Sequence, residues 1–127
     1  MFNNLKKLEK LINSELASKI QSSCVENEEL LIQISENNLV EVVQFLKSNG
    51  QCKFKQLIDI AGIDFPENEK RYRLVYLFLS HEKNLRIKVS IDFDIEKKIP
   101  SIIKLFPSAN WMEREVFDMY GIKSVSY

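Results

Sequence analysis

Four charged residues near the C-terminal end have the types and spacing for acid–base chemistry: Glu113, Arg114, Glu115 and Asp118. Glu115 and Asp118 lie three residues apart on one side of a predicted helix, so each carboxyl would shift the pKa of the other if both were buried. No nucleophile, histidine or metal-ligand cluster accompanies them in this segment. We therefore favour a structural role over a small hydrolase. In that role Arg114 pairs with Asp118 along the helix surface, and the carboxylates meet basic groups of a partner.

Other residues that could support catalysis or bind an ion are isolated from one another. The single histidine, His81, falls in a predicted hairpin turn, where a solvated side chain is expected. Cys24 and Cys52 match neither a CxxC nor a zinc pattern, and we expect free, buried thiols in a reducing compartment. With three glycines in the chain, a glycine-rich phosphate loop is excluded. A calcium loop would need more oxygen ligands than the acids of residues 92–96 provide.

The segment that carries the four charges, residues 109–122, begins and ends like a helix. Asn110 is a favoured N-cap, and Glu113 three residues later completes an Asx form of the capping box. Glu113 and Glu115 place negative charge in the first turn, where the helix dipole favours it. Gly121 can adopt the left-handed conformation that ends a helix. These signals together predict a C-terminal helix.

The apolar content of this helix exceeds what one buried face needs. One stripe consists of Met112, Val116, Met119 and Tyr120, while Trp111 and Phe117 point away from its centre. Aromatic residues, methionine and arginine are enriched at protein interfaces. We therefore expect a helix placed between its own sheet and a second protein; a helix packed entirely on its own core is the alternative. The predicted interface residues are Trp111, Glu113, Arg114, Glu115, Phe117, Asp118 and Tyr120.

Length and charge limit the classes of function. A chain of 127 residues is long enough for one core, and we expect a single domain over residues 1–127. Its 18 basic and 18 acidic residues balance, so no electrostatic footprint for nucleic acid exists. No apolar run is long enough to span a bilayer. Residues 1–10 lack the features of a signal or transit peptide, so we expect a cytoplasmic or cytoplasm-facing protein.

Hydrophobic spacing predicts two helices and two strands in the N-terminal half. Apolar residues recur at helical spacing over residues 5–20, which indicates an amphipathic first helix. Residues 20–24 and 29–34 are two short strands joined by a turn. Ser35 is placed to cap a second helix that ends at residues 49–50. The inward positions of the second helix are Leu39, Val42, Val43 and Leu46.

The C-terminal half is expected to contain three strands and short helices. Residues 54–61 mix both periods, so we expect a turn of helix that leads into a strand through Gly62. Residues 71–80 are apolar on most of both faces and should form a central strand. A hairpin turn joins this strand to the strictly alternating strand of residues 85–93. A short helix is expected over residues 100–107.

The expected order is therefore α-β-β-α-β-β-β followed by short C-terminal helices. Short connections and hairpins favour an antiparallel or mixed sheet with helices on one face. The sequence thus predicts a two-layer α+β fold.

Several blocks of the sequence, in order, resemble one protein family. Residues 111–122, Trp-Met-Glu-Arg-Glu-Val-Phe-Asp-Met-Tyr-Gly-Ile, resemble the E-R-E-x-acidic-apolar-apolar-G-I motif of the 30 kDa-type subunit, or C-subunit, of respiratory complex I. That complex is the proton-pumping NADH:quinone oxidoreductase. Residues 54–66 resemble the family's F-x-x-L-x-D-I-x-G-V-D-Y-P block, and residues 71–76 resemble its R-F-x-V-V-Y strand. Residues 85–89, 99–102 and 107–111 also follow in family order, so the resemblance covers residues 54–122.

The resemblance implies a scaffold role. In the family this subunit lies in the hydrophilic arm and packs against the large subunit that forms the quinone pocket, near the subunit with the terminal iron–sulfur cluster. It is peripheral, on the cytoplasmic face of the cell membrane or the matrix side in mitochondria. NADH, FMN, iron–sulfur clusters and quinone belong to the assembled complex, and none is expected on this chain. The alternatives are the equivalent subunit of an energy-converting hydrogenase and a stand-alone interaction domain.

The end of the chain departs from the family pattern. The family continues after Gly-Ile into a basic H-P-D-L-R-R-type segment and a long extended tail. Residues 123–127 match none of it. The resemblance therefore implies a C-terminally shortened member, which is a truncated version, a domain fragment or a shortened variant with weakened docking.

Overall fold

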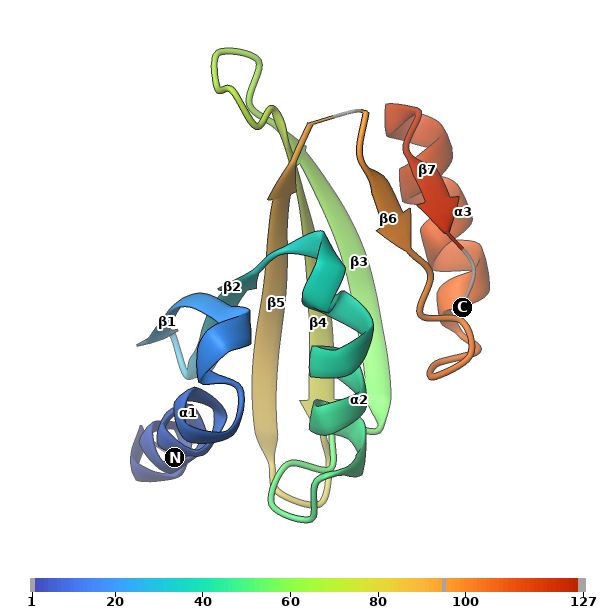
Figure 1. Ribbon diagram of the computed structural model, residues 1–127. Coiled ribbons are helices and arrows are strands. Elements are labelled where there is room, and N and C mark those ends of the chain that lie inside the picture. The colour runs from blue at the N-terminus through green and yellow to red at the C-terminus, as the bar shows by residue number, and fades with distance from the viewer. Residues whose placement is uncertain (1, 95, 126–127) are drawn as a thin grey trace.

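The computed structural model describes residues 2–94 and 96–125 as a two-layer α+β fold, in which helices cover one face of a five-stranded sheet (Figure 1). This arrangement confirms the predicted fold class. The elements in chain order are α1 (Phe2–Glu15), the 3-10 turn η1 (Ala17–Lys19), β1 (Ile20–Glu26), β2 (Glu29–Ile34), the 3-10 turn η2 (Glu36–Asn38), α2 (Leu39–Ser48), β3 (Gln56–Asp64), β4 (Tyr72–Ser80), β5 (Leu85–Phe93), β6 (Lys98–Pro100), α3 (Ala109–Tyr120) and β7 (Lys123–Val125). Residues 126–127, the end of the segment that departs from the family pattern, lie outside the described residues. Among the described helices, none has the length and apolar character needed to cross a bilayer.

The five strands of the main sheet are arranged in the order β1-β2-β5-β4-β3. Neighbouring strands are antiparallel except β2 and β5, which are parallel, so the sheet is mixed. The β1–β2 hairpin turns through Asn27 and Glu28, whose φ angles of 52° and 63° suit the twist of a two-residue hairpin. The strand predicted to be central is β4, which lies inside the sheet between β5 and β3. The middle position belongs to β5.

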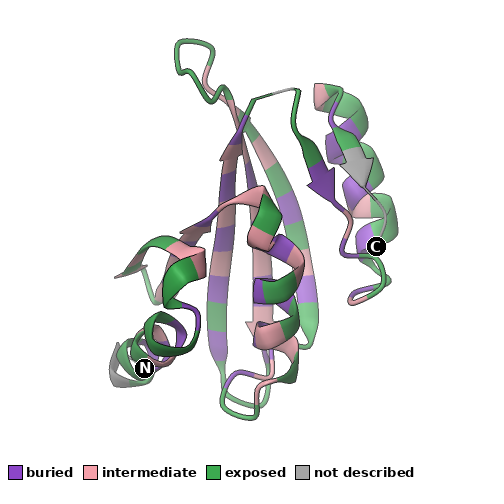
Figure 2. Cartoon of the chain, viewed as in Figure 1, coloured by how far each residue is buried: buried purple, intermediate pink, exposed green. Residues whose placement is uncertain are grey.

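Buried and more exposed residues alternate along β4 and β5, so the sheet has one buried face and one more open face (Figure 2). Every second residue of β5 from Leu85 to Phe93 is buried, as predicted. The three α-helices contribute their buried side chains to the core on this face. None of the described helices covers the other face (Figure 1), where ion pairs join Arg73 to Asp92 and Lys88 to Glu29. Helices on one side therefore leave the opposite side of the sheet for polar cross-strand pairs.

The N-terminal half follows the predicted order with three differences. α1 ends at Glu15, and Ile20 begins β1 instead of extending the helix. Cys24 on β1 is exposed, so the prediction of two buried thiols is wrong. Cys52 is buried, and burial raises the pKa of its thiol to about 11. Ser35 caps the 3-10 turn η2 instead of the second helix as predicted, because α2 begins at Leu39 with Asn38 as its N-cap residue. The predicted inward residues of α2 are all buried.

Residues 54–61 contain no helical turn, contrary to the prediction. They run from a loop directly into β3. A β-bulge between Leu57 and Asp59 interrupts the alternation of side chains. Leu57 and Ile60, three residues apart, are consequently both buried. The helical turn was predicted from the spacing of Phe54, Leu57, Ile58 and Ala61, of which Phe54 and Leu57 are buried and Ala61 is exposed.

The short helix predicted over residues 100–107 does not form in the described chain. Lys98–Pro100 forms β6, and a single hydrogen-bonded turn follows, in which Phe106 N donates to Ile102 O at 2.9 Å. Ile102 and Phe106 are nevertheless buried. β7 was not predicted; it follows α3 and pairs with β6 in parallel. β6 and β7 thereby join the chain segments on either side of α3.

Candidate functional site

α3 carries the predicted functional residues and packs beside the edge strand β3 (Figure 1). The helix begins at Ala109, and its N-cap residue is Ser108, which makes no side-chain capping bond. The predicted capping box of Asn110 is therefore wrong, and the two glutamates lie beyond the first turn. Gly121, with φ of 67°, ends the helix in the left-handed conformation, as predicted.

A glycine in β3 allows α3 to approach the sheet closely. The Tyr120 hydroxyl donates a hydrogen bond to the Gly62 carbonyl oxygen at 3.0 Å. A Cβ atom at position 62 would lie 2.3 Å from Cε2 of Tyr120 and 2.9 Å from Cγ2 of Val116. Any larger residue would therefore displace the helix. Sequence reasoning placed Gly62 in a strand but missed this contact, since the partner lies 58 residues away along the chain.

Glu113 points into the molecule and is only 3% exposed. Its carboxylate accepts hydrogen bonds from Ser101 Oγ at 2.6 Å and from Ile102 N at 2.9 Å. Burial raises the pKa of this carboxyl, and the two hydrogen bonds partly oppose the rise. Glu113 thus ties α3 to the segment that follows β6.

A second buried polar group lies within electrostatic reach of Glu113. The Tyr76 hydroxyl on β4 is buried and has no hydrogen-bond partner in the described part of the chain. Burial raises the pKa of Tyr76, and the negative charge of Glu113 raises it further. The sequence placed Tyr76 within an apolar strand, and no local signal indicated a neighbouring carboxylate.

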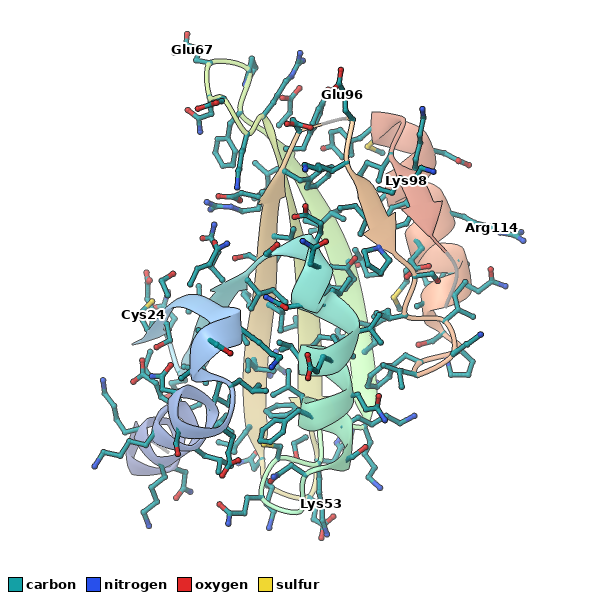
Figure 3. All side chains as sticks on the ribbon, in the orientation of Figure 1. Cys24, Lys53, Glu67, Glu96, Lys98 and Arg114 are labelled. Atoms are coloured by element: carbon teal, nitrogen blue, oxygen red, sulfur yellow. The ribbon has the colours of Figure 1, made fainter. Side chains whose placement is uncertain are left out.

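The opposite side of α3 is uncovered. Trp111 is 57% exposed and Met119 is 75% exposed. Arg114, Glu115 and Asp118 are exposed between them, and Figure 3 shows Arg114 pointing away from the molecule. Within the described residues, none of these three charged side chains makes an ion pair or a hydrogen bond, so the predicted Arg114–Asp118 pair does not form. We call these five residues the α3 outer face.

The predicted interface residues divide between the two sides of the helix. Trp111, Arg114, Glu115 and Asp118 belong to the α3 outer face, while Tyr120 is half-buried against β3. Glu113 and Phe117 are buried in the chain's own core, so neither side chain is available to a partner in this structure. The alternative of a helix packed entirely on its own core is therefore wrong, because one side is uncovered. Contact of that side with a second protein stays a prediction.

The remaining candidate residues are not assembled into a site. His81 is exposed in its hairpin turn, as predicted, next to the side chain of Gln56. Asp92 is paired with Arg73, whose guanidinium lowers the pKa of the carboxyl. Across the described residues, no group of three or more histidine, cysteine, aspartate or glutamate side chains could hold a metal ion.

Known proteins match this chain over most of its length. The model of the family described as respiratory-chain NADH dehydrogenase, 30 Kd subunit, matches residues 32–125. The C-subunit of NADH-quinone oxidoreductase from Chelativorans sp. (strain BNC1) is 42% identical over 118 residues, which are 93% of this chain and 59% of that protein. Its counterpart from Ruegeria pomeroyi is 47% identical over 94 residues, 74% of this chain and 47% of that protein. The chain therefore spans about half the length of the curated relatives it matches.

A solved structure has the same fold. It is a chain of the membrane-bound sulfane sulfur reductase, an archaeal respiratory membrane complex, with a TM-score of 0.79 over 94% of this chain and 69% of that chain. At 23% sequence identity this likeness concerns the fold alone. The family model includes α3, its anchoring contacts with β3 and the segment after β6. By that match and by the identities with its relatives, the chain belongs to the family of the 30 kDa subunit of the respiratory-chain NADH dehydrogenase.

Proposed function

We propose that this chain is a non-redox structural subunit in the hydrophilic arm of a proton-translocating NADH:quinone oxidoreductase. In this role it packs against the large subunit that forms the quinone pocket, near the subunit with the terminal iron–sulfur cluster, and supports electron transfer from NADH to quinone. FMN, the iron–sulfur clusters and quinone are bound by other subunits. The chain lies on the cytoplasmic face of the cell membrane, or on the matrix side in a mitochondrion, as a peripheral subunit.

The observation that carries the proposal is the two-sided construction of α3. Its inner side is held by Glu113, which binds Ser101 and Ile102, and by the Tyr120–Gly62 hydrogen bond. Its outer face presents an exposed tryptophan, an exposed methionine and charges that are unpaired within the described chain. Aromatic residues, methionine and arginine are enriched at the centres of protein interfaces. A helix that is anchored by hydrogen bonds on one side and uncovered on the other suits a scaffold that docks on a second subunit.

Family membership supports the choice of the large subunit as the second subunit. The relatives are named as subunits of NADH-quinone oxidoreductase, and the signature segment of the resemblance is α3 itself. A scaffold of this kind contributes to catalysis by holding its neighbours in a constant relative position. Its loss would therefore lower the amount of assembled enzyme and leave the chemistry of each centre unchanged.

Co-purification from the native host tests the proposal. The chain carries an affinity tag, the host membranes are solubilised in mild detergent, and the recovered proteins are identified by mass spectrometry. Recovery of the quinone-site large subunit with iron–sulfur subunits, at constant stoichiometry, is the expected result. Recovery of a large subunit with nickel ligands would instead indicate an energy-converting hydrogenase. Recovery of the chain alone would contradict the proposal and indicate a stand-alone domain.

A further inference from the structure

A shallow groove runs between α3 and the edge strand β3, beside the α3 outer face. It has a volume of about 310 Å³ and is lined by Ile60, Gly62, Glu115, Val116, Met119 and Tyr120. Its walls are apolar side chains, and at Gly62 the strand contributes backbone without a side chain. Glu115 is the charged residue of this lining. The groove is therefore apolar with an acidic rim, which suits an apolar side chain that has a basic neighbour.

The charges of the α3 outer face are distributed unevenly around the helix. Glu115 and Asp118 lie three residues apart, so their carboxylates are neighbours on the surface. Arg114 lies on the flank away from the groove, where it lines a second hollow with Asn110 and Asp118. The flank toward the groove thus carries the negative charge of Glu115, and Asp118 lies between the two flanks. Neither carboxylate makes an ion pair within the described chain.

An aromatic ring lies next to this negative charge. Trp111 precedes Glu115 by four residues, so the two side chains are neighbours on the same face of α3. The face of an indole ring attracts a cation, and a guanidinium group can stack on the ring while it binds a carboxylate with two parallel hydrogen bonds. One arginine placed here would contact Trp111 and Glu115 together. Lysine could make either contact singly.

We propose that the α3 outer face and this groove bind a basic segment of a partner protein. An arginine or lysine of that segment binds Glu115, with Asp118 as the neighbouring negative charge, and an arginine also stacks on Trp111. An adjacent apolar side chain enters the groove beside Met119. This inference rests on the proposed function, which supplies the large subunit as the partner. It adds the sign of the charge, the anchoring residues and the position of the contact on the helix.

Charge reversal on the intact chain tests the inference. Wild-type chain and variants are expressed with the large subunit of the same complex, and their affinities are compared by titration at low and high salt. Glu115→Lys and Asp118→Lys should each weaken binding about tenfold or more, and the salt dependence of binding should fall, because a like charge then faces the basic segment. Met119→Ala should weaken binding several-fold without changing the salt dependence. All three positions are exposed, so the fold is expected to survive the changes.

Glu67→Lys is the matched control. Glu67 lies in the loop between β3 and β4 (Figure 3), makes no ion pair within the described chain, and undergoes the same change of charge. The affinity of the Glu67→Lys variant for the large subunit should equal that of the wild type. A partner variant in which the contacting arginine or lysine becomes glutamate should restore binding to Glu115→Lys, which a purely structural effect would not allow.

The possible outcomes separate the inference from the function on which it rests. If the wild-type chain binds the large subunit and Glu115→Lys binds equally well, the inference is overturned and the scaffold role stands. If only Arg114→Glu weakens binding, the segment is acidic and the inference is again overturned. If Glu115→Lys disrupts self-association of the chain instead, the occupant is a second copy and the inference fails in its choice of partner. If the wild type binds no subunit of the complex, the proposed function fails as well.

Discussion

Replacing Glu113 tests whether the buried carboxylate holds α3 in place. In Glu113→Ala the backbone N–H of Ile102 loses its acceptor in a buried position, and Ser101 loses the same partner. An unsatisfied buried donor costs about 1–3 kcal/mol, whereas the half-buried Ser101 hydroxyl can turn toward water. Removal of a buried carboxylate relieves some desolvation and offsets part of the loss. We expect a decrease of about 2 kcal/mol in the free energy of unfolding, or about 8 °C in Tm for a chain of this length.

Glu113→Gln separates the hydrogen bonds from the charge. The amide oxygen can accept from Ile102 N, and the amide nitrogen can donate to Ser101 Oγ, so both contacts survive. The variant should stay within about 1 kcal/mol of wild type at neutral pH. Because burial raises the pKa of Glu113 in the folded state, the folded chain retains a proton that the unfolded chain releases. The wild type therefore loses stability relative to Glu113→Gln as pH rises from the ordinary carboxyl pKa of 4.5 through the raised value.

Urea unfolding from pH 4 to pH 8, followed by circular dichroism, measures this difference for the wild type and both variants. Asp64 and Asp92, whose pKa values are lowered by Arg71 and Arg73, contribute the opposite pH dependence. Their contribution is present in every variant and cancels in the difference. The reasoning is refuted if the wild type gains stability over Glu113→Gln with rising pH, or if Glu113→Ala unfolds at the same urea concentration as the wild type.

Three further substitutions and one labelling experiment test other contacts. Gly62→Ala should lower the free energy of unfolding by about 2 kcal/mol, because its Cβ would overlap the tyrosine ring of α3; an unchanged urea midpoint would contradict the close packing. Tyr76→Phe should leave stability unchanged or raise it by up to about 1 kcal/mol, since the hydroxyl is buried without a partner in the described chain; a clear loss would show that the hydroxyl is bonded. Asp92→Asn should lower the free energy of unfolding by about 1 kcal/mol at pH 7 in the same urea experiment. The decrease should be much smaller at a pH below the lowered pKa of the wild-type carboxyl, because the ion pair with Arg73 is already lost there. An equal decrease at both pH values would be inconsistent with the ion pair. A thiol reagent at pH 8 should label Cys24 in the folded protein and Cys52 only after unfolding, as peptide mapping would show; fast labelling of Cys52 would mean that its burial is transient.

The elements predicted correctly are those whose side-chain period is uninterrupted. β5 alternates strictly between apolar and polar residues, and one buried face beneath helices is enough to produce that pattern. The inward residues of α2 repeat at helical spacing because one side of this helix lies on the core. In both elements the local pattern and the tertiary environment agree, so the sequence alone indicates the structure.

The predictions fail where tertiary contacts override the local period. The bulge in β3 brings Leu57 and Ile60 to the same face, so the start of this strand lacks the strict alternation that identifies β5. Residues 98–100 form a strand because β7 pairs with them after α3, and no nearby residue indicates that partner. Both errors arise from contacts that connect distant parts of the chain.

The capping prediction for α3 fails for a related reason. A glutamate three residues after an asparagine matches a capping box, and the pattern is local. The actual partners of Glu113 precede it by 11 and 12 residues, in the turn after β6. A carboxylate can satisfy either set of donors, and the choice depends on which side of the helix faces the core. The sequence identifies the charged residue but does not reveal this orientation.

That orientation also determines which charged residues of α3 can act between subunits. Glu113 and Glu115 are two residues apart, so on a helix they point in widely different directions. The sheet, through Gly62 and Tyr120, sets which of them is turned inward. Glu113 then stabilises the chain's own fold. Glu115 remains on the α3 outer face beside Trp111, and its carboxylate has no ion-pair partner within the described chain. Substitutions at the two glutamates should therefore separate stability from docking: changes at Glu113 should affect unfolding, and changes at Glu115 should affect binding.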